Sequence, residues 1–167
     1  MNVQNKVIVI TGGAGGIGSA QAKLLARNGA EVWILDLVQE KIDQLVEELK
    51  RQGGKAHGAV ADVTSEEEWK TIVECIVSES GRLDVVVNNA GITRDSLMLR
   101  MKEEDWDAVL DTNLKSAFNT VKALQRVLMK SPAGRIINMS SVIGLVGNIG
   151  QANYCLLYTS PSPRDGA

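Results

Sequence analysis

The sequence predicts an α/β fold in which a doubly wound parallel sheet carries helices on both faces. Unbroken runs of branched aliphatic residues, such as Val7–Ile10, are typical of strands buried on both sides. These runs alternate along the chain with segments whose apolar residues repeat at helical spacing. Strands joined by helices imply βαβ units with right-handed crossovers.

Length and composition agree with a single globular domain. The chain has 167 residues, of which 44% are hydrophobic and 23% charged, and its net charge is −2. A general nucleic-acid binder would be basic, so no nucleic acid is expected as a partner. No apolar run approaches the ~18 residues of a membrane span, and no signal peptide is visible. We therefore expect a cytoplasmic protein without a membrane partner, or an organelle-matrix protein if a transit peptide was removed.

Cysteine and histidine content narrows the chemistry further. Cys75 and Cys155 lack the spacing of a disulfide framework or a metal site, which is typical of a reducing compartment. His57 is the only histidine. A Ser-His-Asp triad is therefore excluded unless His57 belongs to it, and no metal site is expected. We interpret His57 as a strand or edge residue.

The first half of the chain predicts three strands, at residues 7–11, 31–36 and 55–60. Glycines end the three helices between and after them, at Gly29, at Gly53 with Gly54, and at Gly81. Ser65 and Glu68 have the spacing of a capping box that starts the third helix. The predicted buried faces consist of Ile17, Ala20, Leu24 and Leu25; of Ile42, Leu45, Val46 and Leu49; and of Trp69, Ile72, Val73, Ile76 and Val77.

The second half predicts two more strands, at residues 83–88 and 135–139. A helical region from Lys102 to Lys130 lies between them. Its predicted apolar side consists of Trp106, Val109, Leu110, Ala117, Phe118, Val121 and Leu124. From Leu156 the sequence LLYTSPSPRDGA changes character, and a helix starting near Gln151 could not pass Pro161 unbroken. We expect one partial domain over residues 1–155 and a disordered tail over 156–167.

The stretch TGGAGGIG, Thr11–Gly18, follows the first strand and opens the first helix. Glycines allow a sharp turn and a close approach of the backbone to a ligand. The N–H groups at the start of the helix, together with its dipole, suit a pyrophosphate. The stretch therefore predicts dinucleotide binding.

Polar residues follow the other strands at the same edge of the sheet, where open α/β sheets bind ligands. Asp36 ends the second strand, Asp62-Val63 follows the third, and Asn88–Gly91 (NNAG) follows the fourth. A carboxylate at Asp36 can accept hydrogen bonds from an adenosine ribose and repels a 2′-phosphate. Because Gly15 supplies no positive charge for that phosphate, NAD is favoured over NADP.

Taken together, TGGAGGIG, Asp62-Val63, NNAG, Asn113, Ser141 and Tyr154 resemble the short-chain dehydrogenase/reductase family in order and spacing. The resemblance runs from about Lys6 to Tyr154 and implies a Rossmann-like fold with strand order 3-2-1-4-5. GITRD (91–95), TNL (112–114) and SSVIGLVGNIGQANY (140–154) are most similar to 3-oxoacyl-[acyl-carrier-protein] reductases of fatty acid biosynthesis. Acetoacetyl-CoA reductases are similar as well.

The resemblance implies a role for each matching residue. Tyr154 would give a proton to the substrate carbonyl, Ser141 would hydrogen-bond that carbonyl, and Asn113 would hold a water in a proton relay. It also implies an acyl thioester substrate, carried by an acyl carrier protein or CoA, and homotetrameric full-length relatives. The cofactor-binding residues that it implies are Thr11, Gly12, Gly15, Gly16, Ile17, Gly18, Asp36, Asp62, Val63, Asn89, Ala90 and Gly91.

The chain departs from the family at one position. The family pattern is Tyr-x-x-x-Lys, and here Tyr158 stands where the lysine belongs. The sixth and seventh strands of the family are also absent, so the sequence resembles a C-terminally truncated member. Two functions follow as alternatives: a nicotinamide-dependent reductase, and a catalytically incompetent dinucleotide-binding fragment or pseudo-enzyme.

A stripe of basic residues also has two alternative interpretations. Lys122, Arg126 and Lys130 repeat at helical spacing and line one helical face. The face is interpreted as a solvated surface, and its alternative is a docking site for an acidic acyl carrier protein.

Overall fold

The computed structural model describes residues 2–159 and the side chains of residues 2–157. Two compact units form within it. The sheet unit consists of residues 2–90 and 116–139, and the helical unit consists of residues 91–115 and 140–159.

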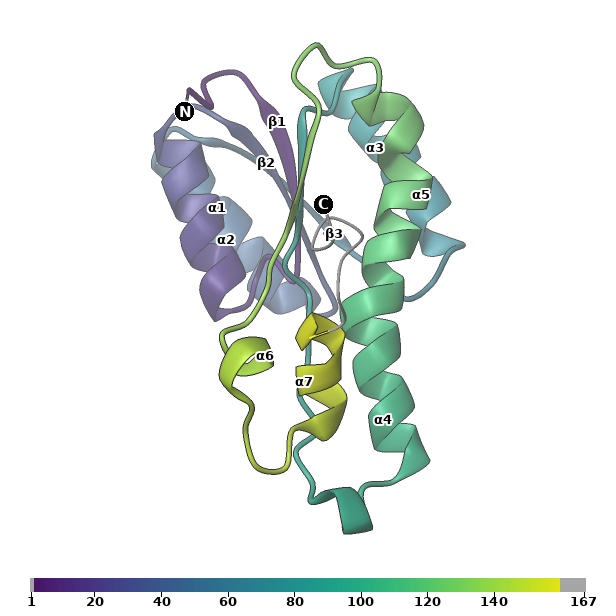
Figure 1. Cartoon of the computed structure of the whole chain (residues 1–167). Coiled ribbons are helices and arrows are strands. Elements are labelled where there is room, and N and C mark those ends of the chain that lie inside the picture. The colour runs from purple at the N-terminus through teal and green to yellow at the C-terminus, as the bar shows by residue number, and fades with distance from the viewer. Residues whose placement is uncertain (1, 160–167) are drawn as a thin grey trace. The chain divides into compact units, whose positions relative to one another are not determined.

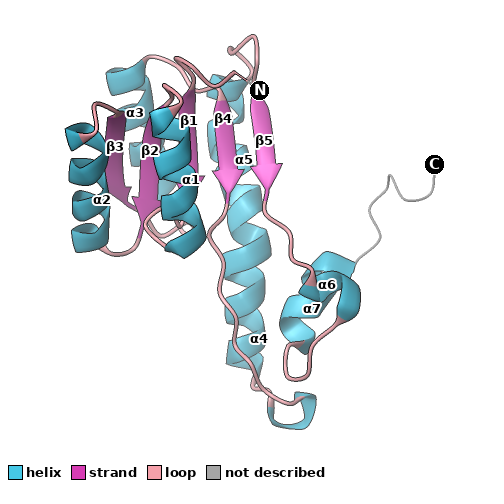
Figure 2. Ribbon diagram, turned by 90° about the vertical axis from the view of Figure 1, so that its left-hand side faces the viewer, coloured by secondary structure: helices cyan, strands magenta, loops and turns pink. Residues whose placement is uncertain are grey.

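The sheet unit is built on five parallel strands in the order β3-β2-β1-β4-β5, as predicted (Figure 2). Two strands are shorter than expected, because β4 begins at Val85 rather than Leu83 and β5 ends at Asn138 rather than Met139. The strands are β1 (Val7–Thr11), β2 (Glu31–Asp36), β3 (Lys55–Val60), β4 (Val85–Asn88) and β5 (Arg135–Asn138).

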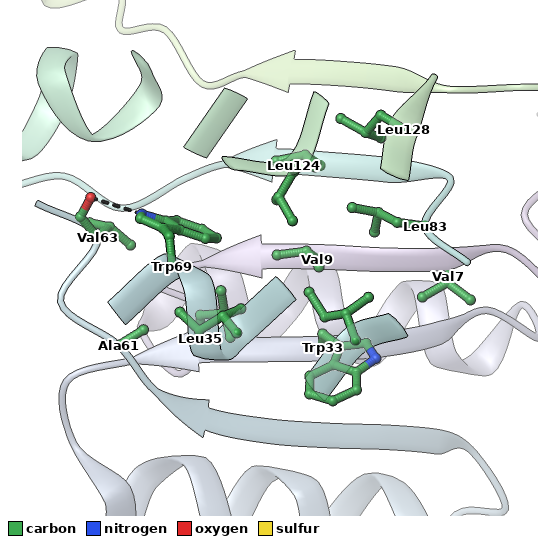
Figure 3. Packing of buried hydrophobic residues seen from close by; sticks show 13 residues of the cluster. Val7, Val9, Trp33, Leu35, Ala61, Val63, Trp69, Leu83, Leu124 and Leu128 are labelled. Atoms are coloured by element: carbon green, nitrogen blue, oxygen red, sulfur yellow. Dashed lines mark hydrogen bonds between the residues drawn. The ribbon is translucent and has the colours of Figure 1, made fainter. Parts of the chain in front are cut away.

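Four helices cover the two faces of this sheet (Figure 1). Helices α1 (Gly16–Arg27) and α2 (Gln39–Arg51) cover one face, and α3 (Glu68–Ser80) and α5 (Ser116–Leu128) cover the other. Alternate strand residues pack into the two layers. Val9 and Leu35 point toward α3 and α5 (Figure 3). Ile8 and Ile34 pack against α1 and α2. Burial on both faces explains why β1 and β2 have continuous apolar sequences, whereas β5, at one edge of the sheet, is exposed.

The predicted face of α1 is wrong. The buried residues are Gly18, Ala22 and Ala26, whereas Ile17 and Leu24 are 65% and 63% exposed. Small residues at intervals of four allow the helix to lie close to the sheet, and the larger side chains then point away from it. The predicted face of α2 is confirmed, with Ile42, Leu45 and Leu49 buried and Val46 partly buried.

Helix α3 begins at Glu68 with only half of the predicted capping box. The Glu68 amide donates to Ser65 Oγ at 3.4 Å, but the Glu68 carboxylate accepts from the Asp62 amide at 2.7 Å. Trp69, Ile72 and Ile76 are buried as predicted, while Val77 is 44% exposed. Gly81 ends the helix at a φ of +69°, a left-handed conformation that glycine adopts readily.

The predicted helix over residues 102–130 is interrupted. A π-helical turn, Asp111–Lys115, separates α4 (Glu103–Leu110) from α5. The predicted apolar side of α5 is right for Leu124, which is buried, but wrong for Phe118, which is 63% exposed. The buried side of α5 consists of Ser116, Asn119, Thr120, Leu124 and Leu128. Asn119 donates to the carbonyl of Thr64, which is distant in sequence, and Thr120 donates to the Ser116 carbonyl one turn earlier in the helix.

His57 lies on β3, the strand at one edge of the sheet. Its ring stacks on Trp33 with a centroid separation of 4.5 Å. One ring nitrogen lies 3.0 Å from Glu31 Oε1 and the other 2.8 Å from Glu79 Oε2. Within residues 2–159 no group of histidine, cysteine, aspartate and glutamate side chains is arranged to hold a metal ion.

The helical unit contains α4, α6 (Ile143–Val146) and α7 (Ala152–Thr159), and α7 packs against both of the others. A 3₁₀ turn, Met98–Arg100, precedes α4. The first residues of the predicted tail, 156–159, belong to α7, and residues 160–167 lie outside the described part of the chain. No helix among the described residues is long and apolar enough to cross a membrane.

Candidate cofactor and catalytic site

Neighbouring atoms leave no room for a side chain at two glycines of the loop after β1, Gly12 and Gly18. Gly12 has a φ of +60°, and a Cβ there would come within 2.9 Å of the Ala90 Cα. A Cβ at Gly18 would come within 2.8 Å of the Gly13 Cα and 2.9 Å of Asn89 Nδ2. Because contacts this short do not occur, only glycine fits at both positions without a shift of the backbone.

The start of α1 is open to an anionic ligand. No side chain caps the helix at Gly15, and its first turn holds no acidic residue. Around Gly16 a Cβ would meet no atom within 4 Å. A helix N-terminus with unpaired amides and a positive dipole end stabilises a pyrophosphate. The residues present therefore fit a dinucleotide.

Two predicted cofactor residues join the loops after β1 and β4. The amides of Asn89 and Ala90 both donate to Thr11 Oγ1 at 3.0 Å. In turn, the Asn89 side chain donates to the carbonyls of Thr11 and Gly12, at 3.0 and 3.1 Å. Thr11 is itself buried, so its hydroxyl positions these loops.

Asp36 holds the glycine loop against the end of β2. Its Oδ2 accepts the Ala14 amide at 3.0 Å, and its Oδ1 accepts the Leu37 amide at 2.8 Å. The carboxylate therefore sits beside the start of α1, where the sequence predicts that it meets a ribose. Leu37, the next residue, is 66% exposed.

The pair Asp62-Val63 divides into two structural roles. Asp62 Oδ1 accepts both the amide and the hydroxyl of Thr64, at 2.9 and 2.6 Å. The Val63 side chain lies in the core, and its carbonyl accepts the Trp69 indole N–H at 3.2 Å (Figure 3). The Val63 side chain therefore belongs to the core, and the Asp62 carboxylate is held in place by Thr64.

The helical unit contains all three predicted catalytic residues, together with Gly91. Asn113 lies in the π-helical turn, a feature that recurs at functional sites. Its Oδ1 accepts the Ile92 amide at 2.7 Å and its Nδ2 donates to the Ile92 carbonyl at 2.9 Å. A Cβ at Gly91 would lie 3.0 Å from Asn113 Oδ1. Both polar atoms of this side chain thus clamp the segment that begins at Gly91.

Ser141 and Tyr154 flank the loop that carries α6. The Ser141 hydroxyl accepts the Ile143 amide at 3.3 Å at the start of α6. Tyr154 lies in the first turn of α7, half-buried, and its amide donates to Asn153 Oδ1 at 2.9 Å. Position 158 is one turn further along the same helix, as its spacing predicts.

Sequence reasoning missed the polar residues beside Tyr154. Gln151 is 8% exposed and Asn153 is fully buried. Gln151 Nε2 donates to both carboxylate oxygens of Asp95 at 3.0 Å. Asn153 Nδ2 donates to the Arg94 and Asp105 carbonyls, at 3.1 and 3.4 Å. The two motifs that hold these residues were recognisable in the sequence, but nothing local shows that they meet.

The basic stripe on α5 is partly neutralised. Lys122 Nζ lies 2.5 Å from Glu66 Oε1 and 5.8 Å from the centre of the Phe118 ring. The hydrogen bond from Lys122 lowers the pKa of the Glu66 carboxyl below its ordinary value. Arg126 and Lys130 are exposed.

Comparison with known proteins finds relatives over most of the chain. A 3-oxoacyl-[acyl-carrier-protein] reductase of Thermotoga maritima is 48% identical over 154 residues, which cover 92% of this chain and 63% of the relative. One from Vibrio cholerae is 46% identical over 154 residues, covering 92% of this chain and 62% of the relative. The chain thus spans less than two thirds of the length of these relatives.

A solved structure extends the comparison to the fold. The crystal structure of a short chain dehydrogenase from Mycobacterium smegmatis matches with a TM-score of 0.89 at 33% identity, covering 95% of this chain and 67% of that one. The family model described as short chain dehydrogenase matches residues 6–156. The chain therefore belongs to the short chain dehydrogenase family.

Proposed function

We propose that this chain carries the dinucleotide-binding and proton-donating parts of a reductase that converts a 3-oxoacyl thioester to the 3-hydroxyacyl form. The observation that supports this most is the open N-terminus of α1 behind a closed glycine loop, together with Ser141 and Tyr154 in the helical unit. The relatives that match over 92% of the chain are 3-oxoacyl-[acyl-carrier-protein] reductases. Fatty acid biosynthesis in the cytoplasm or an organelle matrix is the proposed setting.

The proposed cofactor is NAD rather than NADP. Asp36 places a carboxylate next to the glycine loop, and it repels a 2′-phosphate. When bound, the reduced nicotinamide supplies a hydride. The amides at the start of α1 bind the pyrophosphate, and Gly12 and Gly18 keep the loop close enough for that contact.

The proton chemistry belongs to the helical unit. We propose that the Tyr154 hydroxyl gives its proton to the carbonyl oxygen and that Ser141 Oγ donates a hydrogen bond to the same oxygen. A phenol with an ordinary pKa of about 10 exchanges its proton poorly at neutral pH without a nearby cation. We propose that Asn113 has two roles. It keeps the segment that begins at Gly91 in place, and it also takes part in a proton relay.

A second function is favoured by position 158. The lysine of the family pattern would stand one helical turn after Tyr154, and a tyrosine occupies that position in α7. The chain as it stands is therefore proposed to bind the dinucleotide without useful turnover. We propose an acyl carrier protein as the partner of an enzyme of the relatives' full length. The proposed assembly of that enzyme is a homotetramer.

The proposed reaction is tested with a completed version of the chain that carries Tyr158→Lys and a family-like C-terminal third. It should reduce acetoacetyl-CoA to 3-hydroxybutyryl-CoA and should reduce a simple ketone such as acetone far more slowly. Turnover of acetone at the rate of the thioester would contradict the proposed substrate class. No consumption of reduced cofactor with either compound would contradict the proposed reaction.

A further inference from the structure

The segment from Gly91 to Ser96 has no helix or strand of its own, yet it is fixed at both ends within the helical unit. Asn113 clamps Ile92 through two hydrogen bonds. At the other end, the Ser96 amide donates to the Gly150 carbonyl at 2.8 Å. The segment therefore links the π-helical turn that carries Asn113 to the loop that leads into α7.

The first turn of α7 is bound to this segment by buried side-chain amides. Gln151 and Asn153 are both buried, and a buried amide without a partner costs about 1–3 kcal/mol. Both are fully engaged: Gln151 donates to Asp95 and accepts from Asn148 Nδ2 at 3.0 Å. Asn153 donates to the Arg94 and Asp105 carbonyls.

Asn153 also contacts Tyr154 directly, because its Oδ1 accepts the Tyr154 amide. A single side chain thus joins the backbone of Tyr154 to the 91–96 segment and to the first turn of α4. Gln151 lies one residue before α7 begins. Its hydrogen bond to Asp95 is charge-assisted, so it is stronger than the bond from Asn153 to the Arg94 carbonyl.

We propose that Gln151 and Asn153 are positioning residues for Tyr154, which act by fastening the first turn of α7 to Arg94 and Asp95. This inference rests on the proposed role of Tyr154 as the proton donor. Neither side chain is assigned to the substrate or the cofactor. Their effect is to limit the orientations of the helix from which the phenol projects.

The link from Gln151 to Asp95 can be broken and rebuilt. Gln151→Glu places two carboxylates against each other and repels α7 from the segment. Adding Asp95→Asn restores a donor–acceptor pair with reversed direction, because the new amide at position 95 can donate to the new carboxylate at position 151. That carboxylate can also still accept from Asn148 Nδ2.

The chain has only two tyrosines, so Tyr154 can be observed alone. In a Tyr158→Phe background labelled with 3-fluorotyrosine, the parent should give one sharp fluorine resonance away from that of free fluorotyrosine. Gln151→Glu and Asn153→Ala should each split the resonance or move it toward the free value. The Gln151→Glu/Asp95→Asn pair should restore the parent signal. Asp95→Ala, at an exposed position, is the milder variant and should move the signal in the same direction.

Ser131→Ala is the matched control. It removes the hydrogen bond that Ser131 Oγ donates to Asp84 Oδ1 at 2.5 Å within the sheet unit. It should lower the melting temperature and leave the Tyr154 resonance unchanged. The inference is overturned if Gln151→Glu leaves the resonance in place, if the paired variant fails to restore it, or if Ser131→Ala moves it equally. No substrate is used, so a failure of the proposed reductase activity would be seen separately, in the turnover assay.

Discussion

The side-chain amide of Asn89 donates to the carbonyl oxygen of Gly12 at 3.1 Å. This bond joins the loop after β4 to the glycine loop after β1, so two segments far apart in the sequence form one surface at the carboxyl edge of the sheet. The same amide donates to Thr11, and the Thr11 hydroxyl accepts the Asn89 backbone amide in return. The proposed dinucleotide site is therefore held by contacts between loops as well as by the glycines themselves.

Replacing Asn89 by alanine should loosen this site. Asn89→Ala removes the side-chain donor to the Thr11 and Gly12 carbonyls, of which Gly12 still accepts the Gly15 amide at 3.2 Å. We expect this change to destabilise the sheet unit by about 0.5–1.5 kcal/mol for each lost hydrogen bond and to weaken NADH binding. Urea unfolding and isothermal titration check the two effects. Asn28→Ala removes an exposed amide that donates to the Leu24 carbonyl and should change neither by much. Equal losses in both variants would contradict the assigned role of Asn89.

The two glycines at the start of α1 should respond in opposite ways to an added methyl group. Gly18→Ala forces a Cβ against the Gly13 Cα, and such overpacking typically costs about 1–3 kcal/mol. Gly16→Ala meets no atom and should keep or slightly raise stability, because alanine favours the helix. Thermal unfolding of both variants makes the comparison. A stable Gly18→Ala protein would show that the loop is looser than described.

Cofactor preference should follow Asp36. We expect NADH to bind more tightly than NADPH by on the order of 1–3 kcal/mol, since a carboxylate would face a 2′-phosphate without a cation. Asp36→Ser should narrow this difference. Asp43→Asn on α2 changes the same charge at a carboxylate that accepts from Gln39, and should leave the preference as it is. Isothermal titration with both cofactors measures it; equal or tighter NADPH binding by the parent chain would contradict the proposal.

The buried carboxylate of Asp84 should make stability depend on pH. Burial alone would raise its pKa, but hydrogen bonds from Arg82, Ser131 and the Val7 amide outweigh burial and lower the pKa below its ordinary value. The unfolded chain therefore binds this proton more readily than the folded one. The contribution is complete above the unfolded pKa of about 4 and is lost as pH falls through the lower folded value.

Asp84→Asn tests this dependence. At neutral pH it should cost about 1–3 kcal/mol, because a side-chain amide cannot accept all the bonds that Asp84 accepts. The difference from the parent should shrink as the pH falls below about 4. Asp111→Asn breaks an exposed pair with Lys115 at 3.4 Å and should cost less than about 0.5 kcal/mol. Urea unfolding across pH measures both, and a difference that grows toward acid pH would contradict the sign.

The sheet was predictable from the sequence, but which faces of α1 and α5 are buried was not. Strands buried on both faces leave unbroken apolar runs, so the bounds of β2 follow from pattern alone. The prediction of β3 depends on its place in the alternation of strands and helices, and the strand order depends on the family resemblance. In α1 the buried face is made of glycine and alanine, and a search for large apolar residues selects Ile17 and Leu24 instead. In α5 the buried face includes Ser116, Asn119 and Thr120, and the partner of Asn119, the Thr64 carbonyl, is brought to it by a tertiary contact.

The same limit applies to the candidate site. Glycine spacing and strand-end residues predict the cofactor loop, because both follow from local geometry. The roles of Thr11 and Asn89 in joining two loops, and of Gln151 and Asn153 in fixing α7, depend on partners that are distant in sequence. Asn113 is the clearest example of a contact that the sequence does not predict. Its side-chain amide pairs with the backbone of Ile92, and it lies in a π-helical turn that has no periodic sequence pattern.

Acetoacetyl-CoA reduction by three versions of the chain shows whether Tyr154 acts as a proton donor and whether position 158 limits turnover. The versions are this chain, its Tyr158→Lys variant, and a version that carries this substitution and a family-like C-terminal third. Loss of reduced-cofactor absorbance measures the rate, and loss of a positioned acid–base group usually costs roughly 10²–10⁴-fold. We expect turnover by the third version alone, and Tyr154→Phe should abolish it there. Turnover by the unmodified chain at the rate of the third version would contradict this expectation.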